Sequence, residues 1–447
     1  MSTDIKGGNE PQFKKVLGLK DLVIYGIAFM TPIAPAYIYG SAATSTGGLL
    51  PLAYLIAMIA MMFTAYSYGR MAAAFPVAGS TYTYTQRSIN PHLGFFAGWA
   101  MFMDYVLVPL IVFMVGASYA NALLPAVPYW VWVLIIATVI TTINILGIEM
   151  AVKMNNLLVL FMGLVVLIFI FFCIRSVTNA DGASAIISVA PFFNEQFATT
   201  AVIGGAAMAC FSFLGFDSIT TLSEEAIDPK RDMWKAAILS CLIGGLIFIA
   251  QAYVAQLVWP DVHSFISEDT ALFDIAHKAG GAALSTIYTV AIIASTFTAG
   301  LTGQASASRL MFSMGRDEVL PKKFFTYMHP KFKTPILNIL LMGTISVVGA
   351  LALQISFVAE LMNFGGLMGF MFVNLSVIAY YYFRKGEKKF FRYLLLPALG
   401  FLICLYLFIN LSPLTLKVGF IWLGIGFVYA AVRTRGFKVS PVILKGL

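Results

Sequence analysis

The sequence predicts an all-α polytopic membrane protein with twelve transmembrane helices. Of its 447 residues, 60% are hydrophobic and only 11% are charged, whereas a soluble domain carries about 25% charged residues. Apolar runs of membrane-spanning length recur from residue 21 to residue 432. The first and the sixth of these runs are interrupted in their middle by proline or by glycine and a carboxylate. Paired interruptions of this kind are typical of inverted repeats in secondary transporters.

Twelve apolar runs define the predicted spans, because a membrane helix needs about 20 such residues. Pro51, Pro109 and Pro335 fall near the ends of runs or at possible kinks. The predicted spans are 21–43, 49–69, 93–119, 129–147, 154–174, 199–222, 235–258, 282–312, 335–353, 358–383, 393–411 and 415–432.

The basic residues predict the topology. Of the 28 Lys and Arg residues, 25 fall on the side of both termini, and only Arg175, Lys278 and Lys417 fall on the other. Loops rich in Lys and Arg stay in the cytoplasm. We therefore expect cytoplasmic N- and C-termini, a multi-pass location in the plasma membrane, and the lipid bilayer as partner. The net charge of +8 is then a topology signal, and we expect no nucleic-acid binding.

The sixth run contains the stretch around which the chain is organised. It reads as an apolar helix from Ala206 until it meets Gly215 and Asp217. A charged group at mid-membrane costs at least a few kcal/mol, so it needs a partner or a function. Ser218, Thr220 and Thr221 follow closely and can satisfy backbone groups freed by a break. Because irregular backbone at membrane depth is tolerated only in protein or around a cavity, this stretch predicts half of a binding site.

The first run supplies the other half. Pro32 removes a backbone donor and disturbs the preceding turn, and Pro35 repeats the disturbance three residues later. The alternative is an ordinary proline kink, but the matching break in the sixth run favours a functional one. The residues that we assign to this half of the site are Gly26, Ala28, Met30, Thr31 and Pro32.

The two breaks divide the chain into predicted segments. A five-helix inverted repeat places a break in the first and the sixth spans. The segments are a cytoplasmic N-terminal part (1–20), the first repeat (21–174), the second repeat (199–383), two further helices (393–432) and a cytoplasmic tail (433–447).

Two carboxylates are predicted inside the membrane, Asp217 at the break and Asp104 half-way along the third span. We expect both to bind substrate and to take part in proton coupling. The alternative for Asp104 is a structural hydrogen bond to neighbouring helices. Phe211 or Phe213 is a candidate gate that can stack on an ammonium group, although aromatic side chains also face lipid. The remaining candidate binding residues around this break are Phe211, Ser212, Phe213 and Gly215.

Two loops suggest further elements. In the outer loop from Trp259 to Gly281, Ser267 and the acids after it predict a short helix that begins at an N-cap. This helix is either a lid or a passive connection. The loop from Phe75 to Gly98, rich in small and aromatic residues, is a candidate for an inner gate. The hydroxyls of the eighth span either line a path or serve as helix-packing contacts.

Several function classes are excluded. We find no nucleotide motif, no metal-ligand spacing and no nucleophile–base pair, so we expect no enzyme, metal or cofactor. The four cysteines lie in or at the ends of apolar runs, and we expect no disulfide and no cleavable signal peptide.

Three stretches together resemble the amino acid–polyamine–organocation superfamily over essentially the whole chain. They are Phe75–Tyr84 with Gly94–Trp99, Phe211–Asp217 through Ser223-Glu-Glu225, and Ser308-Arg through Met314-Gly-Arg-Asp317. Within the superfamily the chain is most similar to bacterial putrescine importers. The resemblance implies the superfamily's 5+5 inverted-repeat fold, with substrate between spans 1, 3, 6, 8 and 10 and usually proton-coupled transport. It also implies that Phe211 is a gating aromatic and Asp217 an acid tied to coupling.

The departures from the family pattern bear on the substrate. Thr31-Pro32 stands where many amino acid permeases have a Gly-x-Gly break, and proline offers no N–H to an α-carboxylate. Tyr37 stands where the resemblance to putrescine importers leads us to expect an acid, and Met162 where some proton-coupled members have a lysine.

We expect a secondary active importer of a small ammonium-bearing solute, either putrescine or another polyamine, or an amino acid, with H⁺ as the coupling ion. An amino acid exchanger or importer that binds the α-carboxylate at the first break stays open. So does a channel or a transport-inactive sensor on the same fold.

Overall fold

The computed structural model describes residues 17–75, 80–146, 149–194, 197–222, 226–316, 321–332, 334–434 and 436–437. Several predicted features lie outside these residues: the chain before Leu17, residues 76–79 of the inner loop, Ser223-Glu-Glu225, Asp317, and most of the C-terminal tail. The side chains of Lys153, Thr221, Arg309, Met314 and Arg316 also lie outside the description.

The described chain is built from helices, and its only β-type pairing is one bridge between Leu17 and Ala226. Eleven helical runs in this part of the chain are long and apolar enough to cross a membrane. A twelfth, α12 (Ile336–Ala352), is apolar but has 17 residues, or about 25 Å against a hydrocarbon core of about 30 Å. The prediction of an all-helical protein with twelve apolar spans is confirmed.

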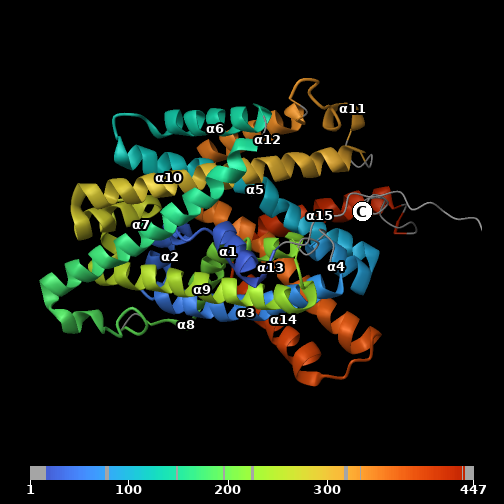
Figure 1. Ribbon diagram of the computed structural model, residues 1–447, viewed down its shortest axis with the longest axis horizontal. Helices are drawn as coiled ribbons and strands as arrows, with labels where there is room; N and C mark the ends of the chain where they lie inside the picture. Colours follow the sequence, from blue (N-terminus) through green and yellow to red (C-terminus); the bar gives the residue numbers. More distant parts are fainter. Residues whose placement is uncertain are drawn as a thin grey trace, which may run out of the picture.

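The helices follow the predicted order, mostly with later ends than the apolar runs suggested. Figure 1 shows their arrangement as a bundle of long helices. The long elements are α1 (Leu19–Met30), α3 (Leu50–Ala74), α5 (Pro91–Leu123), α6 (Tyr129–Leu146), α7 (Glu149–Asp181), α8 (Thr199–Ala209), α9 (Pro229–Val258), α10 (Ala271–Arg316), α13 (Ile355–Val377), α14 (Leu396–Ile409) and α15 (Pro413–Arg433).

Short elements complete the breaks and loops. They are η1 (Ala34–Tyr37), α2 (Tyr39–Ser45), α4 (Ser80–Ser88), η2 (Ala183–Ile186), η3 (Cys210–Phe213), η4 (Phe216–Leu222), η5 (Val262–Ser264), η6 (Glu268–Thr270), α11 (Lys322–Phe325), η7 (Ile378–Arg384) and η8 (Phe391–Leu395).

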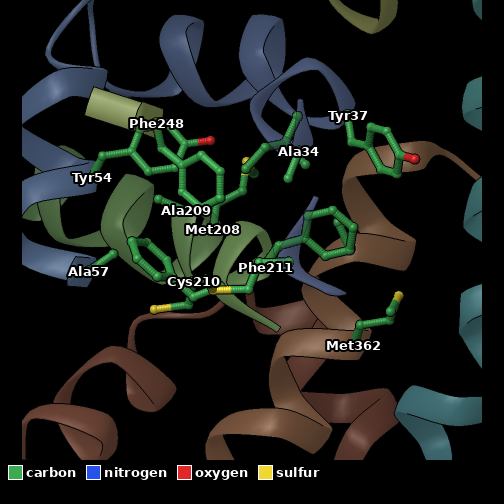
Figure 2. Close-up of a cluster of buried hydrophobic side chains, with 14 of the residues drawn as sticks. Ala34, Tyr37, Tyr54, Ala57, Met208, Ala209, Cys210, Phe211, Phe248 and Met362 are labelled. Atoms are coloured by element: carbon green, nitrogen blue, oxygen red, sulfur yellow. The ribbon is translucent and has the colours of Figure 1, made fainter. Parts of the chain in front are cut away.

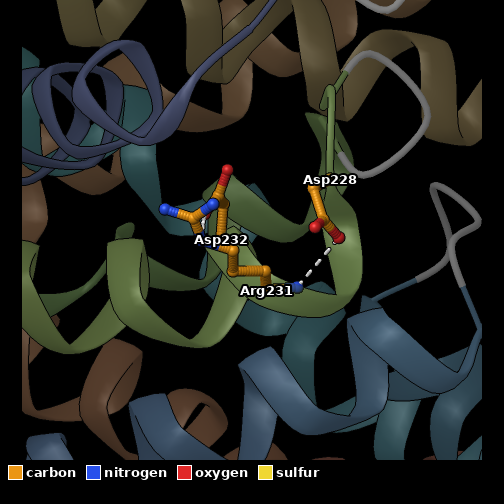
Figure 3. Close-up of polar contacts among 3 residues, drawn as sticks. All are labelled: Asp228, Arg231 and Asp232. Carbon is orange, nitrogen blue, oxygen red and sulfur yellow. Dashed lines mark hydrogen bonds and ion pairs between the residues drawn. The ribbon is translucent and has the colours of Figure 1, made fainter.

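The start of α9 shows why helix ends differ from the apolar runs. The predicted span began at residue 235, but the helix begins at Pro229. The carboxylate of Asp228 accepts a hydrogen bond from the amide of Arg231 at 3.2 Å, as Figure 3 shows. Asp232 lies in the first turn, 3.5 Å from the Arg231 side chain, where an acid stabilises the helix dipole. A polar cap therefore extends the helix beyond its apolar residues.

The prolines act as expected. Pro51 lies in the first turn of α3, and Pro335 immediately precedes α12. Pro109 lies inside α5 without ending it, because neighbouring helices can satisfy the freed backbone group.

The breaks after α1 and after η3 lie near the centre of the bundle. α1 packs on α9 and on η4, and α9 packs along α3. On the opposite side α5 packs on α10 and α13. In Figure 1, α1 lies near the middle of the view, with α9 and α3 below it and α5 and α10 above it. This placement brings the first and sixth spans together with the third.

Candidate functional site

The first span is broken where the two prolines predicted it. α1 ends at Met30, and Thr31 has φ 54° and ψ 122°, outside any helical region. The chain resumes as η1 at Ala34, with Pro35 in its first turn, and then as α2. A non-glycine residue at positive φ stores strain and is held there by its surroundings. The predicted break is confirmed.

The sixth span is broken at Gly215, as predicted. α8 continues into η3, and the helix stops before Gly215, which has φ 108°. Glycine adopts this conformation readily, whereas an L side chain does not. A Cβ here would also collide with the ring of Phe29, at the end of α1. The two breaks therefore lie against each other.

Two buried amides stabilise the helix ends at the breaks. The Gln251 amide in α9 donates to the Pro32 carbonyl at 2.8 Å, and the Tyr288 hydroxyl donates to Gln251 Oε1 at 3.2 Å. In α13, Asn363 Nδ2 donates to the carbonyls of Ala207 and Met208 at 2.9 and 3.2 Å. Sequence reasoning missed both amides. The sequence feature that could have identified them is an uncharged polar residue in the middle of an apolar run.

Hydroxyl groups satisfy other backbone atoms of the second break. Ser218 Oγ donates to the Gly215 carbonyl at 2.5 Å, and Thr220 Oγ1 donates to the Asp217 carbonyl at 2.6 Å. This confirms the prediction for Ser218 and Thr220. These two carbonyls thus have donors within their own segment.

Asp217 and Asp104 come from different spans and lie within electrostatic range of each other. The Asp217 carboxylate accepts hydrogen bonds from the amides of Gly215 and of Asp217 itself. Asp104 Oδ1 is buried and has no hydrogen-bond partner among the described residues. Both side chains are half-buried, and neither forms an ion pair with a described Lys, Arg or His. Tyr105 lies near both charges. The two carboxylates therefore share one region without a cation from this part of the chain.

The two candidate gate residues face different ways. The ring of Phe211 lies 6.1 Å from the ring of Tyr37, centroid to centroid, and is tilted by 37°. Phe213 is fully buried and packs edge-on against Phe248 of α9 at 5.3 Å. Figure 2 shows Phe211 turned toward Tyr37, and Phe248 on the other side of the segment. Phe211 is therefore the aromatic residue of this pair that faces the first span.

Tyr37 lies at the junction of three spans. Its hydroxyl is hydrogen-bonded to Ser295 Oγ of α10 at 2.8 Å, and Ser295 donates to the Ile292 carbonyl at 2.7 Å. Tyr119 of α5 donates to the Ala36 carbonyl at 2.8 Å. These bonds fix the segment after the first break against α5 and α10.

The other predicted binding residues have mixed surroundings. A Cβ on Gly26 would collide with Ile219 and Ser240, so this glycine allows η4 and α9 to approach α1. The Met30 thioether points toward Gly244 of α9, and Ser212 Oγ is hydrogen-bonded to Tyr54 at 2.9 Å. Ala28 is half-buried. Gly26, Met30 and Ser212 thus contact neighbouring helices, and binding by any of them stays a prediction.

Three threonine hydroxyls of the eighth span are hydrogen-bonded within α10. Thr296, Thr298 and Thr302 donate to the carbonyls of Ile293, Ala294 and Thr298. These hydroxyl groups therefore donate their hydrogen bonds to the backbone of their own helix. In the described part of the chain, no group of three or more His, Cys, Asp or Glu side chains lies close enough to hold a metal ion.

The outer loop covers the segment after the first break. The backbone of Glu268 lies so close to Gly40 that a Cβ there would collide with it. The predicted short helix exists from Ala271 until Gly281, where φ 70° interrupts α10. Ser267 is the N-cap residue of η6, with acids in the first turn as predicted, but its side chain makes no capping hydrogen bond. Whether this helix is a lid or a passive connection stays a prediction.

The inner loop forms a helix against α5. α4 (Ser80–Ser88) packs close to Gly94 and Gly98, where a Cβ would meet Gln86 and Tyr82. Its role as an inner gate stays a prediction.

Comparison with known proteins agrees with this geometry. Residues 21–441 match the model of a family described as amino acid permease. The chain is 37% identical to the low-affinity putrescine importer PlaP of Escherichia coli (strain K12), over 96% of each chain. It is 27% identical to the branched-chain amino acid permease BcaP of Bacillus subtilis, over 95% of this chain and 94% of that one. It is also 27% identical to the methylthioribose transporter of Bacillus subtilis, over 94% of each chain. With two broken spans in a bundle of twelve and a family match over nearly its full length, this chain belongs to the amino acid permease family.

Proposed function

We propose that this permease is a secondary active importer of a small organic cation, with putrescine as the leading candidate. The observation that carries the proposal is the pair Asp104 and Asp217, which share one region without a cation from the described residues. Carboxylates at membrane depth are costly unless they are paired. A substrate ammonium group supplies the missing charge.

The rings beside the break support a cationic substrate. Phe211 and Tyr37 lie together at the end of the site that faces η1. An ammonium over such rings gains about 0.5–2 kcal/mol. A diamine can place one ammonium at the carboxylates and the other against the rings. The identity of 37% with a putrescine importer supports the same substrate class.

The proximity of the two carboxylates also suggests how a proton drives uptake. Two like charges in a buried site repel each other. We propose that either Asp104 or Asp217 carries a proton while the other binds the substrate ammonium. Binding of the proton and binding of the substrate are then coupled, because both neutralise the negative charge of the same pair of carboxylates.

The charge distribution supports the orientation of the protein. With 25 of 28 Lys and Arg residues on the side of both termini, we propose cytoplasmic termini and a plasma-membrane location. The breaks in spans 1 and 6 support a division into repeats at 21–174 and 199–383. The orientation is tested by placing single cysteines in the loops and termini of the permease and labelling intact cells with a thiol reagent that does not cross the membrane. Labelling of cysteines at both termini from outside the cell would contradict the proposed orientation.

Uptake into proteoliposomes tests the function. Labelled putrescine and a panel of amino acids are offered to vesicles with an alkaline interior. We expect saturable putrescine uptake that a protonophore abolishes. Asp217→Asn removes the proposed charge, and Asp181→Asn, at an exposed residue at the end of α7, is the matched control. Putrescine uptake that persists in full without a proton gradient would contradict the coupling.

A second candidate function is amino acid import, with the α-carboxylate at the first break. The Ile33 amide donates to no acceptor in the described part of the chain, so one backbone donor beside the break lacks a partner there, although Pro32 has no N–H. Two relatives at 26% and 27% identity are branched-chain amino acid permeases. Uptake of an amino acid with which putrescine does not compete would favour this function.

The same uptake assay separates a transporter from a channel or a sensor. A channel would show neither saturation nor counterflow, and a sensor would bind without uptake.

A further inference from the structure

Arg70, in the last turns of α3, lies inside a cage of aromatic rings. Its Cζ atom lies 5.1 Å from the ring centroid of Tyr66, 5.5 Å from that of Trp234 and 5.9 Å from that of Tyr393. Tyr393 stacks on Tyr381 at 4.5 Å, and the Tyr381 hydroxyl donates to the Arg70 carbonyl at 3.2 Å. We call these four rings, from α3, α9, η7 and η8, the Arg70 cage.

Two polar atoms of the cage lack partners. Arg70 Nε and the Tyr66 hydroxyl are both buried, and neither has a hydrogen-bond partner among the described residues. Arg70 also forms no ion pair with a described acid. One acid lies beside the cage: Glu387 is hydrogen-bonded to Tyr393 and lies 3.9 Å from Lys389. Because unpaired buried donors are costly, the cage is suited to an added hydrogen-bond acceptor.

The surroundings of the cage are positively charged. Lys235 lies 5.7 Å from the Trp234 ring, and Lys385 lies 5.3 Å from the Tyr381 ring. Residues 383–392 comprise the end of η7, the connection after it and the start of η8, and we call them the η7–η8 loop. This loop carries one acid, Glu387, against five basic residues: Arg384, Lys385, Lys388, Lys389 and Arg392. The acceptor that fits this field is an anion.

The same loop identifies the anion as part of a membrane. Phe383, Phe390 and Phe391 are 68%, 50% and 70% exposed. Exposed aromatic and basic side chains at the ends of two spans are typical of the phospholipid headgroup region. In Figure 1 this loop projects from the bundle at the lower right, beyond α14.

We propose that the Arg70 cage binds the headgroup phosphate of an anionic phospholipid in the leaflet that faces this loop. The rings hold the guanidinium by cation–π contact. Its N–H groups are then free to donate to the phosphate oxygens, together with the Tyr66 hydroxyl. Lys235 and Lys385 add attraction for the negative headgroup. The site joins α3 and α9, which flank the broken first span, to the loop before α14.

Lipid binding by the purified permease tests the proposal. Native mass spectrometry counts bound phosphatidylglycerol in competition with phosphatidylcholine, and melting temperature is measured against the phosphatidylglycerol content of the micelles. Arg70→Gln is compared with Arg175→Gln, which changes an exposed arginine in α7. We expect Arg70→Gln to lower phosphatidylglycerol occupancy by about fivefold or more and Arg175→Gln to leave it unchanged.

Other outcomes overturn the proposal. Equal phosphatidylglycerol binding by wild type and Arg70→Gln would show that Arg70 does not contribute to lipid binding. If inorganic phosphate displaces phosphatidylglycerol and raises the melting temperature as much as phosphatidylglycerol does, the cage is a site for a soluble anion and not for a lipid. Where Arg70→Gln does not fold, the double variant Lys235→Gln/Lys385→Gln replaces it. We then expect a partial loss of phosphatidylglycerol, and full retention contradicts the proposal.

Discussion

Gln251 in α9 donates a 2.8 Å hydrogen bond to the carbonyl of Pro32, across the first break. Gln251 is fully buried, and its own oxygen accepts from Tyr288 of α10. One amide thus connects the broken span to two intact ones. In the second break Asn363 has the same role for the end of α8. The breaks are therefore held open by side chains of other spans and not by proline and glycine alone.

Replacing Gln251 by leucine should destabilise the protein and reduce uptake. The Pro32 carbonyl and the Tyr288 hydroxyl would both lose a partner, which costs about 1–3 kcal/mol for each buried group. Thermal unfolding in detergent and putrescine uptake measure the two effects. Gln354→Leu is the control, because Gln354 is exposed before α13 and makes no side-chain cap. Equal stability of both variants would show that the bond to Pro32 does not support the break.

Replacing Gly215 by alanine should abolish uptake. At φ 108° a Cβ is strained, and here it would also meet the Phe29 ring. A non-glycine residue in such a backbone region costs about 1–3 kcal/mol. Gly204→Ala in α8 is the matched control, since a Cβ there meets nothing within 4 Å. Alanine in a helix interior stabilises by about 0.5–1 kcal/mol relative to glycine. Normal uptake by Gly215→Ala would show that the second break tolerates an ordinary residue.

Asp217→Asn should abolish gradient-driven uptake more than substrate binding. The amide keeps the shape of the side chain and its place beside the amides of Gly215 and Asp217, but it cannot exchange a proton. We expect accumulation driven by a pH gradient to disappear while putrescine still binds, as measured by thermal stabilisation. Asp104→Asn should have the same kind of effect, because Asp104 lies within electrostatic range of Asp217. Uptake by both variants that still follows the pH gradient would place proton coupling elsewhere.

The sequence predicts the spans and both breaks because these depend on local properties. Apolar length defines a span, and proline or glycine marks an interruption. The capping amides depend instead on partners distant in the chain. Gln251 lies 219 residues from Pro32, and Asn363 lies 156 residues from Ala207. An amide in an apolar run does not reveal which carbonyl it reaches, so these residues emerge only from the fold.

The same limit applies to Phe211 and Phe213, which the sequence could not distinguish. They lie two residues apart where α8 gives way to η3, so a small change in backbone geometry decides which ring faces the first span. The structure turns Phe211 toward Tyr37 and Phe213 toward Phe248. One substitution at each position therefore separates a binding role from a packing role.

Phe211→Leu should raise the KM for an ammonium-bearing substrate by about two- to thirtyfold, because a cation–π contact contributes about 0.5–2 kcal/mol and about 1.4 kcal/mol is tenfold. Its melting temperature should change little. Phe213→Leu should show the reverse, since Phe213 is fully buried and a change of shape in a packed core costs about 1–3 kcal/mol. Saturation kinetics of uptake and thermal unfolding are measured on both variants. A KM that rises equally in both would show that the site responds to general repacking, and Phe211 would then have no particular contact with the substrate.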